Sequence, residues 1–241
     1  MDSQDYYGVK GTLTVYGVPG IPKSHGSSAF LVLGRGRDDH FAAIQAGWAV
    51  SPEDYGDDRT HFTIVWTTDG FQKEGCVDLS CPGFVQVNKQ YTPGFAFPQV
   101  SVYNGTQITK QIIISKDKKS GNWWLMIGPD KLPIGYWPNS LFKDLGLDES
   151  AKLISLGGIA HAPRYEAGPP MGSGHFPEEG WNKACAITGV QYLDASNNFR
   201  DPTDTSKSAD RVLCYNVGNP FGTDQHDGLA FFFGGPGGCT N

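Results

Sequence analysis

Short runs rich in β-branched and aromatic residues recur along this chain, and Gly, Pro, Asn or Asp bounds most of them. In residues 11–18, GTLTVYGV, the side chains alternate, with Leu13, Val15 and Gly17 on one face. Runs of this length and bias are typical of β-strands. We expect further strands within residues 28–36, 61–70, 83–88, 107–117, 122–128, 184–194, 211–218 and 228–235.

Only one stretch has helical spacing, and it lies within residues 138–158. There Leu141, Leu145 and Leu147 predict one short helix, with Asn139 or Ser140 at its cap. The segment DKKSGN, residues 117–122, is typical of a hairpin turn. With no alternation of strands and long helices, the pattern predicts an all-β antiparallel sandwich or barrel, as a single domain over residues 1–241.

Composition excludes several classes of function. The net charge is −6 and no basic stripe exists, so we expect no nucleic-acid partner. No apolar run is long enough to span a bilayer, so we expect no membrane partner, and the polar start MDSQDYYGVK is not a signal peptide. No pattern indicates a cofactor. The cysteine spacing does not match zinc sites, so we expect no metal.

The chain has five cysteines, an odd number that leaves at least one unpaired if the others form disulfides. Cys76 and Cys81 enclose only VDLS, a loop that a disulfide can close, and Cys214 and Cys239 could tie the last strands to the tail. The alternative is five reduced thiols in a cytosolic protein.

Six motifs together resemble the neprosin domain family, in family order and over roughly residues 7–240. They are IQAGWAVSPEDYGDD (44–58), FTIVWTTDGFQKEGCVDLSCPGFVQ (62–86), GNWWLMIG (121–128), IGYWPNSLF (134–142), PPMGSGHFPEEGW (169–181) and FFFGGPGG (231–238). The resemblance implies a β-sandwich of two large antiparallel sheets with a long cleft. It also implies glutamic-peptidase activity after proline, and secretion with an activation segment that residues 1–241 lack.

The secreted character of the family favours the disulfide alternative. We therefore expect disulfides Cys76–Cys81 and Cys214–Cys239 and a free Cys185, in a mature extracellular protein.

Both catalytic glutamate positions of the family are substituted in this chain. The resemblance places the first glutamate in I-E-A-G-W, where this chain has Gln45, and the second in G-G-E-V, where it has Ile159. A glutamic peptidase needs a carboxylate to activate water and an acid to protonate the leaving nitrogen. Gln45 can still donate a hydrogen bond to an oxyanion, but Ile159 has no acid–base chemistry.

Other residues could supply catalysis near these positions. If residues 43–50 form a strand, Gln45 lies among small side chains, which suits either a ligand-facing floor or a buried bridge between backbone groups. The family resemblance favours the ligand-facing floor. Glu166 follows Ile159 by seven residues in a loop, and His161 would share its face on a strand. No Ser-His-Asp or Cys-His set is legible from the sequence.

Aromatic residues within the family motifs give the last signal. We expect the cleft to be lined by Trp48, Trp66, Trp124, Tyr136, Ile159 and His175. On a strand, Trp123 and Trp124 face opposite sides, so one belongs to the core. Aromatic rings stack on proline and on sugars.

These observations favour a non-proteolytic binding or repurposed protein whose cleft takes a peptide, proline-rich or other, or another small ligand. The alternative is a proline-directed endopeptidase that uses Gln45 with another acid such as Glu166.

Overall fold

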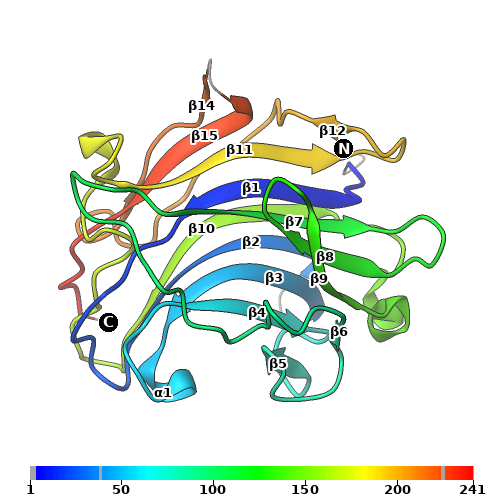
Figure 1. Ribbon diagram of the computed structural model, residues 1–241, viewed down its shortest axis with the longest axis horizontal. Helices are drawn as coiled ribbons and strands as arrows, with labels where there is room; N and C mark the ends of the chain where they lie inside the picture. Colours follow the sequence, from blue (N-terminus) through cyan, green and yellow to red (C-terminus); the bar gives the residue numbers. More distant parts are fainter. Residues whose placement is uncertain (1–3, 38–39, 224–225, 241) are drawn as a thin grey trace.

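The computed structural model of the protein describes residues 4–37, 40–223 and 226–240. Strands dominate these residues and form two antiparallel sheets, whose arrangement Figure 1 shows. The structure confirms the expected all-β sandwich, in which one sheet is larger than the other. No helix in the described ranges is long and apolar enough to cross a membrane.

The larger sheet has the strand order β13-β15-β11-β1-β7-β8-β9-β6, with β12 beside β11 and β14 beside β15. Its strands are β1 (Gly8–Thr14), β6 (Val85–Gln86), β7 (Thr109–Lys116), β8 (Trp123–Ile127), β9 (Leu132–Trp137), β11 (Cys185–Leu193), β12 (Phe199–Arg200), β13 (Asn216–Val217), β14 (Phe221–Thr223) and β15 (His226–Gly234). The expected turn at residues 117–122 joins β7 to β8, with Gly121 at φ 76°.

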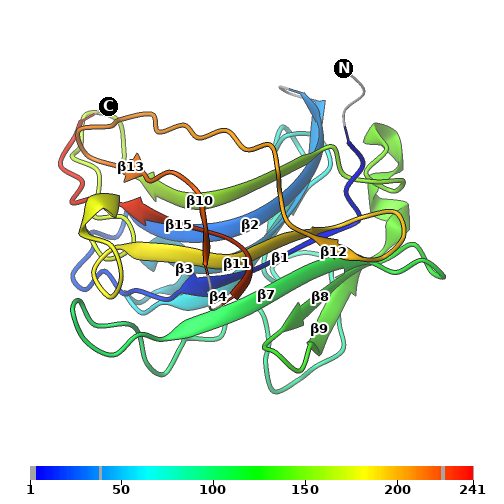
Figure 2. The same ribbon diagram turned by 90° about the horizontal axis from the view of Figure 1, so that it is seen from above.

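The smaller sheet has the order β10-β2-β3-β4-β5. Its strands are β2 (Gly26–Arg37), β3 (His40–Val50), β4 (His61–Thr67), β5 (Gly75–Val77) and β10 (Leu153–His161). Figure 2 shows β10, at the edge of this sheet, running beside β15 of the larger sheet. Gly158 of β10 lies against Met171 and Phe233, where a β-carbon would come within 3 Å of both side chains.

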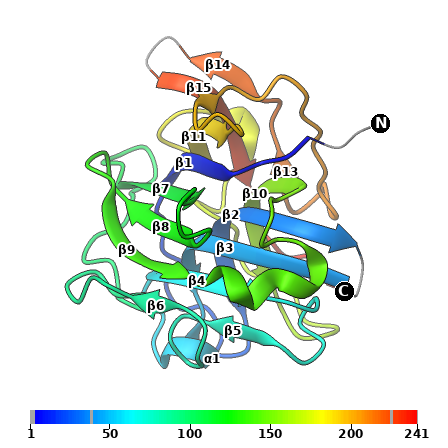
Figure 3. The same ribbon diagram turned by 90° about the vertical axis from the view of Figure 1, so that its right-hand side faces the viewer.

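The hydrophobic core lies between the inner faces of the two sheets, which Figure 3 shows from the side. Alternation along β3 sends Ile44, Ala46 and Trp48 into this core and turns Gln45 and Gly47 to the outer face. From the larger sheet Leu13 and Trp123 pack into the same core. The outer face of the smaller sheet is therefore left for other contacts.

Helical structure is short. The described helices are α1 (Pro52–Tyr55) and two 3₁₀ segments, η1 (Asn139–Leu145) and η2 (Pro177–Glu179). The expected helix within residues 138–158 is thus confirmed only at its start. Gly146 at φ 78° ends the helix, and the following segment becomes β10, because residues 153–161 pair with β2 along their whole length.

The cysteines pair as expected. The disulfide Cys76–Cys81 closes the short loop after β5. The disulfide Cys214–Cys239 joins the segment before β13 to the C-terminal segment. Cys185 is free and buried.

Candidate functional site

The outer face of the smaller sheet carries Gln45. This residue pairs with Val32 of β2 and Val65 of β4, and through Val32 its row reaches Ser155 of β10. The Gln45 side chain is half-buried, and within the described residues no hydrogen bond holds it. Its amide can therefore contact a ligand.

Ile159 lies on the same outer face but in a different row. It pairs with Ser28, which pairs with Ala49, and 52% of its surface is exposed. Between this row and that of Gln45 lies the row of Phe30, which is flanked by Gly157 and Gly47. In a flat sheet the Cα atoms of Gln45 and Ile159 would be roughly 16 Å apart.

Most of this outer face of the smaller sheet carries no charged side chain. The outward-facing positions of β2, β3, β4, β5 and β10, within the described residues, include no Asp or Glu. The two titratable residues there are His61 and His161. The strands themselves therefore supply no general acid or base of the carboxylate kind.

A pocket of 240 Å³ opens at one end of this face, beside α1. Apolar side chains of Phe30, Val65, Val77 and Ile159 form part of its wall. Its polar lining consists of Ser24, His25, Ser27, Ser28, Ser51, Glu53, Asp54, Tyr55, Thr63 and His161. Gln45 does not belong to the lining, although its neighbour Val65 does.

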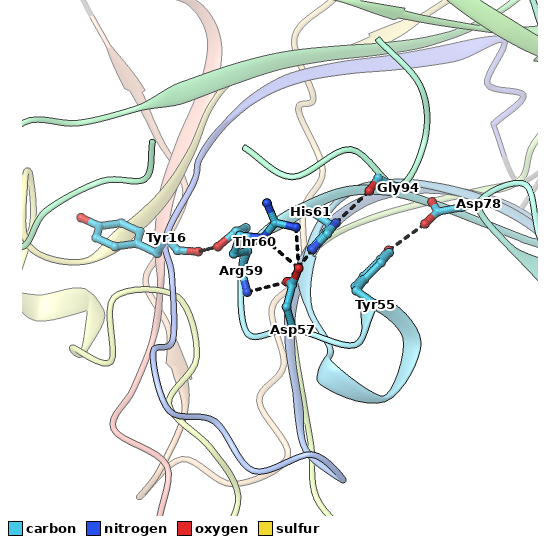
Figure 4. A network of polar contacts seen from close by, with 8 residues as sticks. All are labelled: Tyr16, Tyr55, Asp57, Arg59, Thr60, His61, Asp78 and Gly94. Atoms are coloured by element: carbon cyan, nitrogen blue, oxygen red, sulfur yellow. Dashed lines mark hydrogen bonds and ion pairs between the residues drawn. The ribbon is translucent and has the colours of Figure 1, made fainter. Parts of the chain in front are cut away.

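A polar network underlies this pocket and is drawn in Figure 4. The Tyr55 ring stacks on the His61 ring, with centroids 3.9 Å apart. His61 Nε2 lies 2.9 Å from Asp57, and its Nδ1 lies 2.8 Å from the Gly94 carbonyl. The Gly94 carbonyl and the Asp57 carboxylate are both acceptors, so each ring nitrogen of His61 faces an acceptor. The network fixes Tyr55 over the end of β4.

Asp78 is the buried acid of the network. Its carboxylate accepts the Ile64 N–H at 2.9 Å and the Tyr55 hydroxyl at 2.8 Å, and its side chain is 8% exposed. Burial raises the pKa of the Asp78 carboxyl above its ordinary value, while these hydrogen bonds oppose the shift. Burial and the neighbouring Asp78 together raise the pKa of the Tyr55 phenol. Hydrogen bonds from Arg59 and His61 lower the pKa of Asp57.

Glu166 lies near the pocket but not with Gln45. Its carboxylate is 3.7 Å from Nε2 of His25, a pocket-lining histidine that is 5% exposed. His161 lines the same pocket, across the strand pair from Gly26. The structure thus brings His161, Ile159 and Glu166 to one end of the face, while Gln45 sits beyond the Phe30 row.

Two tryptophans expected in the cleft are in the core instead. Trp48 is 1% exposed and donates its indole N–H to the Thr14 carbonyl at 2.9 Å, and Trp66 is 5% exposed. Side chains alternate between the two faces of a strand. Trp48 and Trp66 each directly follow an outward-facing residue, in β3 and β4 respectively, and therefore point into the core. The expectation that they line the cleft is wrong.

Trp124 and Tyr136 lie on the opposite side of the molecule. Trp123 of β8 is buried in the core, so Trp124 points to the outer face of the larger sheet, where its ring is 4.9 Å from that of Tyr136. The expected split between Trp123 and Trp124 is therefore confirmed. The assignment of Trp124 and Tyr136 to the cleft of Gln45 is wrong.

His175 is likewise absent from the pocket lining. Its Nδ1 lies 2.7 Å from Glu179, its ring stacks on Tyr103 at 3.9 Å, and Tyr103 donates to the second oxygen of Glu179. The segment that holds His175 and Glu179 packs on β15 of the larger sheet. The expected cleft-lining role of His175 is therefore also wrong.

Sequence reasoning missed Tyr55, Asp78 and His25. Tyr55 and Asp78 lie in family motifs, but nothing in the spacing linked the tyrosine in α1 with an acid 23 residues later. His25 stands between Ser24 and Gly26, and no acidic residue lies next to it in the sequence. Only the fold brings Glu166 to it.

The fold and this face define an all-β protein of two antiparallel sheets, with one sheet face bare of carboxylates and hollowed at one end. The family model of neprosin matches residues 23–236, and the chain therefore belongs to the neprosin family. Among solved structures, the chain is similar to a Scytalido-glutamic peptidase crystallised with a peptide-based transition-state analogue. That similarity has 10% sequence identity and a TM-score of 0.42, and it covers 97% of this chain and 93% of the other.

Proposed function

We propose that this neprosin-family protein binds a proline-containing peptide on the outer face of its smaller sheet and does not cut it. The observation that carries the proposal is the exposed Ile159, which stands on that face where the family resemblance implies a catalytic glutamate.

The chemistry of the face supports a binding role. Peptide hydrolysis by carboxylates needs one group to take a proton from water and one to protonate the leaving nitrogen, and positioned groups of this kind contribute about 10²–10⁴-fold in rate. Gln45 can donate a hydrogen bond but cannot exchange protons near neutral pH. With Ile159 opposite, the face keeps a hydrogen-bonding group and lacks the base.

The shape of the face supports an extended ligand. Gly47 and Gly157 flank Phe30 in the middle row, so a peptide backbone can approach the sheet closely there. At the end of the face, Tyr55 and Ile159 offer an aromatic ring and an aliphatic side chain to a proline ring. Binding through these groups requires no catalysis.

A proline-directed peptidase that pairs Gln45 with Glu166 is the less favoured alternative. Glu166 is more than half exposed and lies beside His25, and Gln45 does not line the pocket that His25 lines. The pair would need a loop movement before both could contact one water.

We also propose that the protein is extracellular. Two disulfides support this, because disulfides form and persist in oxidising compartments and are rare in the cytosol.

The test measures binding and cleavage of one labelled proline-rich peptide. Fluorescence polarisation should show saturable binding, and mass spectrometry across acidic to neutral pH should show intact peptide. Ile159→Arg should weaken binding at least tenfold, about 1.4 kcal/mol. Leu213→Arg is the matched control, because Leu213 is an apolar residue 86% exposed in a loop outside this face.

Absence of saturable binding, or an equal loss in both variants, would contradict the binding proposal. Cleavage after proline by the unmodified protein would favour the peptidase alternative, and Glu166→Gln should then abolish it.

A further inference from the structure

Beside α1, a serine and a histidine of the pocket lie next to a glutamate outside its lining, a set that the peptide-binding role does not use. Ser24 Oγ lies 3.3 Å from His25 Nδ1, and His25 Nε2 lies 3.7 Å from the Glu166 carboxylate. Ser24 and His25 both line the pocket. We propose that Ser24 and His25 act as nucleophile and general base, and that the pocket hydrolyses short-chain carboxylic esters.

The tautomer of His25 follows from its contacts. Its Nε2 lies 3.1 Å from the Ala167 carbonyl oxygen. A carbonyl oxygen has no proton to give, so Nε2 carries the hydrogen and donates it. In neutral imidazole the other nitrogen, Nδ1, is then unprotonated and accepts from the Ser24 hydroxyl. His25 is thus held in the form that a general base requires.

Burial keeps this arrangement in place. The His25 ring is 5% exposed, and its backbone N–H donates to the Pro22 carbonyl in the turn before β2. Ser24, in contrast, is exposed and lines the pocket. The distance between Ser24 Oγ and His25 Nδ1 is slightly longer than in a tightened catalytic pair, as is common before substrate binds.

Glu166 is the third member of the proposed catalytic set. When Ser24 gives its proton to Nδ1, the His25 ring becomes an imidazolium, and the nearby carboxylate stabilises that charge. The Ala167 carbonyl keeps Nε2 oriented through the change. Because Glu166 is 54% exposed, water weakens its effect, and we treat it as a positioning residue.

The pocket also fits an acyl group. Its volume of 240 Å³ and the apolar side chains of Phe30, Val65 and Val77 suit a short aliphatic chain.

The reaction balances with water as the second reactant. Ser24 Oγ bonds to the ester carbonyl carbon while its proton moves to His25 Nδ1, and the carbonyl π electrons move to oxygen. Collapse of this intermediate breaks the bond to the alcohol oxygen, which takes the proton from Nδ1. Water then attacks the acyl-serine, gives its proton to Nδ1 and releases the carboxylic acid. The proton on Nδ1 returns to Ser24.

The experiment uses a fluorophosphonate probe, which labels activated serines, together with p-nitrophenyl butyrate hydrolysis. The unmodified protein should be labelled at Ser24, located by peptide mass spectrometry, and should hydrolyse the ester. Ser24→Ala should remove the label and lower kcat/KM at least about 100-fold, the lower bound for positioned acid–base catalysis. Because Ser24 is exposed, this variant should fold normally. Ser208→Ala, at another exposed serine, should change neither readout.

The role of Glu166 is tested by exchange and rescue. Glu166→Gln should lower kcat by several-fold and leave KM unchanged, and Glu166→Asp should restore most of the loss, because only a negative charge stabilises the imidazolium. Failure of Ser24 to react with the probe, or ester hydrolysis that persists in Ser24→Ala, would overturn the proposal. Peptide binding is measured separately, so either proposal can fail without the other.

Discussion

Gln45 and Ile159 share one face of the smaller sheet, yet Ile159 is level with Ala49, four residues along β3 from Gln45. One strand, β2, lies between them, and Phe30 occupies the intervening row. A flat sheet would separate their Cα atoms by roughly 16 Å. Two glutamate side chains, each reaching roughly 5 Å from Cα by ordinary bond lengths, would leave about 6 Å, the span of one bridging water. The positions can cooperate only through two long side chains that lean over the Phe30 row.

Ile159→Glu should therefore raise cleavage after proline above the undetectable level that we expect of the unmodified protein. The new carboxylate can act as base, while the Gln45 amide stabilises the oxyanion. Because Ile159 is 52% exposed, the free energy of unfolding should change by only about 0.5 kcal/mol. A fluorogenic proline-containing peptide, assayed with thermal melts, measures both effects.

The double variant Gln45→Glu with Ile159→Glu extends the test. Like charges near one another cannot both ionise easily, so one carboxyl should act as acid and the other as base. Leu153→Glu, at an outward-facing residue in the first position of β10, is the matched control and should give no cleavage. If the folded single and double variants bind peptide but do not cut it, this face does not support a glutamic peptidase.

Much of the fold could be predicted from the sequence because the residue types and alternation of a β-strand can be recognised within a few neighbouring residues. The hairpin at residues 117–122 and the short loop between Cys76 and Cys81 depend on neighbours in sequence, and both were predicted correctly. The strand expected within residues 211–218 is mostly wrong, since only Asn216–Val217 form a strand and Leu213 is exposed in a turn. Local propensity cannot show whether a run finds a pairing partner.

The site was harder to predict because its contacts join distant segments. Alternation correctly placed Gln45 on a face of small residues, but the same rule places Trp48 in the core, and family motifs alone suggested otherwise. Trp124 belongs to a different sheet, which no local pattern reveals. Glu166 reaches His25 only because the loop after β10 returns to the start of β2.

Cys185 should be the one alkylatable thiol, and only after unfolding. Burial raises the pKa of the Cys185 thiol to about 12, so almost no thiolate exists near neutral pH. Iodoacetamide at pH 8 should leave the native protein unmodified and add one label in denaturant without reductant. Reduction before labelling should add four more, from the two disulfides. Five labels without reductant would show that the disulfides do not form.

Asn104 should carry an N-linked glycan when the protein is secreted from eukaryotic cells. The sequon Asn104-Gly105-Thr106 lies in an exposed turn, in which the Gly105 N–H donates to the Val102 carbonyl. The Asn104 side chain is exposed, so a glycan attached there can extend into solvent. Glycosidase treatment should lower the mass, and Asn104→Gln should abolish the shift. Thr106→Ser should retain it, and an unshifted native protein would refute the prediction.

Asp78 should make stability depend on pH in the opposite sense from a salt-bridged carboxylate. Burial raises its pKa in the folded protein, so the folded state holds this proton more tightly than the unfolded chain does. The resulting stabilisation is fully present below the ordinary carboxyl pKa of about 3.9 and is lost as the pH rises through the raised value. Asp78→Asn keeps an acceptor for the Ile64 N–H and removes the titration.

The difference in unfolding free energy between the Asn variant and the unmodified protein should therefore shift in favour of the variant as the pH rises from 4 to 7. Asp78→Ala should instead cost about 1–3 kcal/mol at pH 4, because it leaves the Ile64 N–H without its partner. Urea unfolding at both pH values measures all three proteins. A difference between Asp78→Asn and the unmodified protein that stays constant with pH would mean that Asp78 does not titrate differently on folding, and that its hydrogen bonds from Tyr55 and Ile64 fully offset its burial.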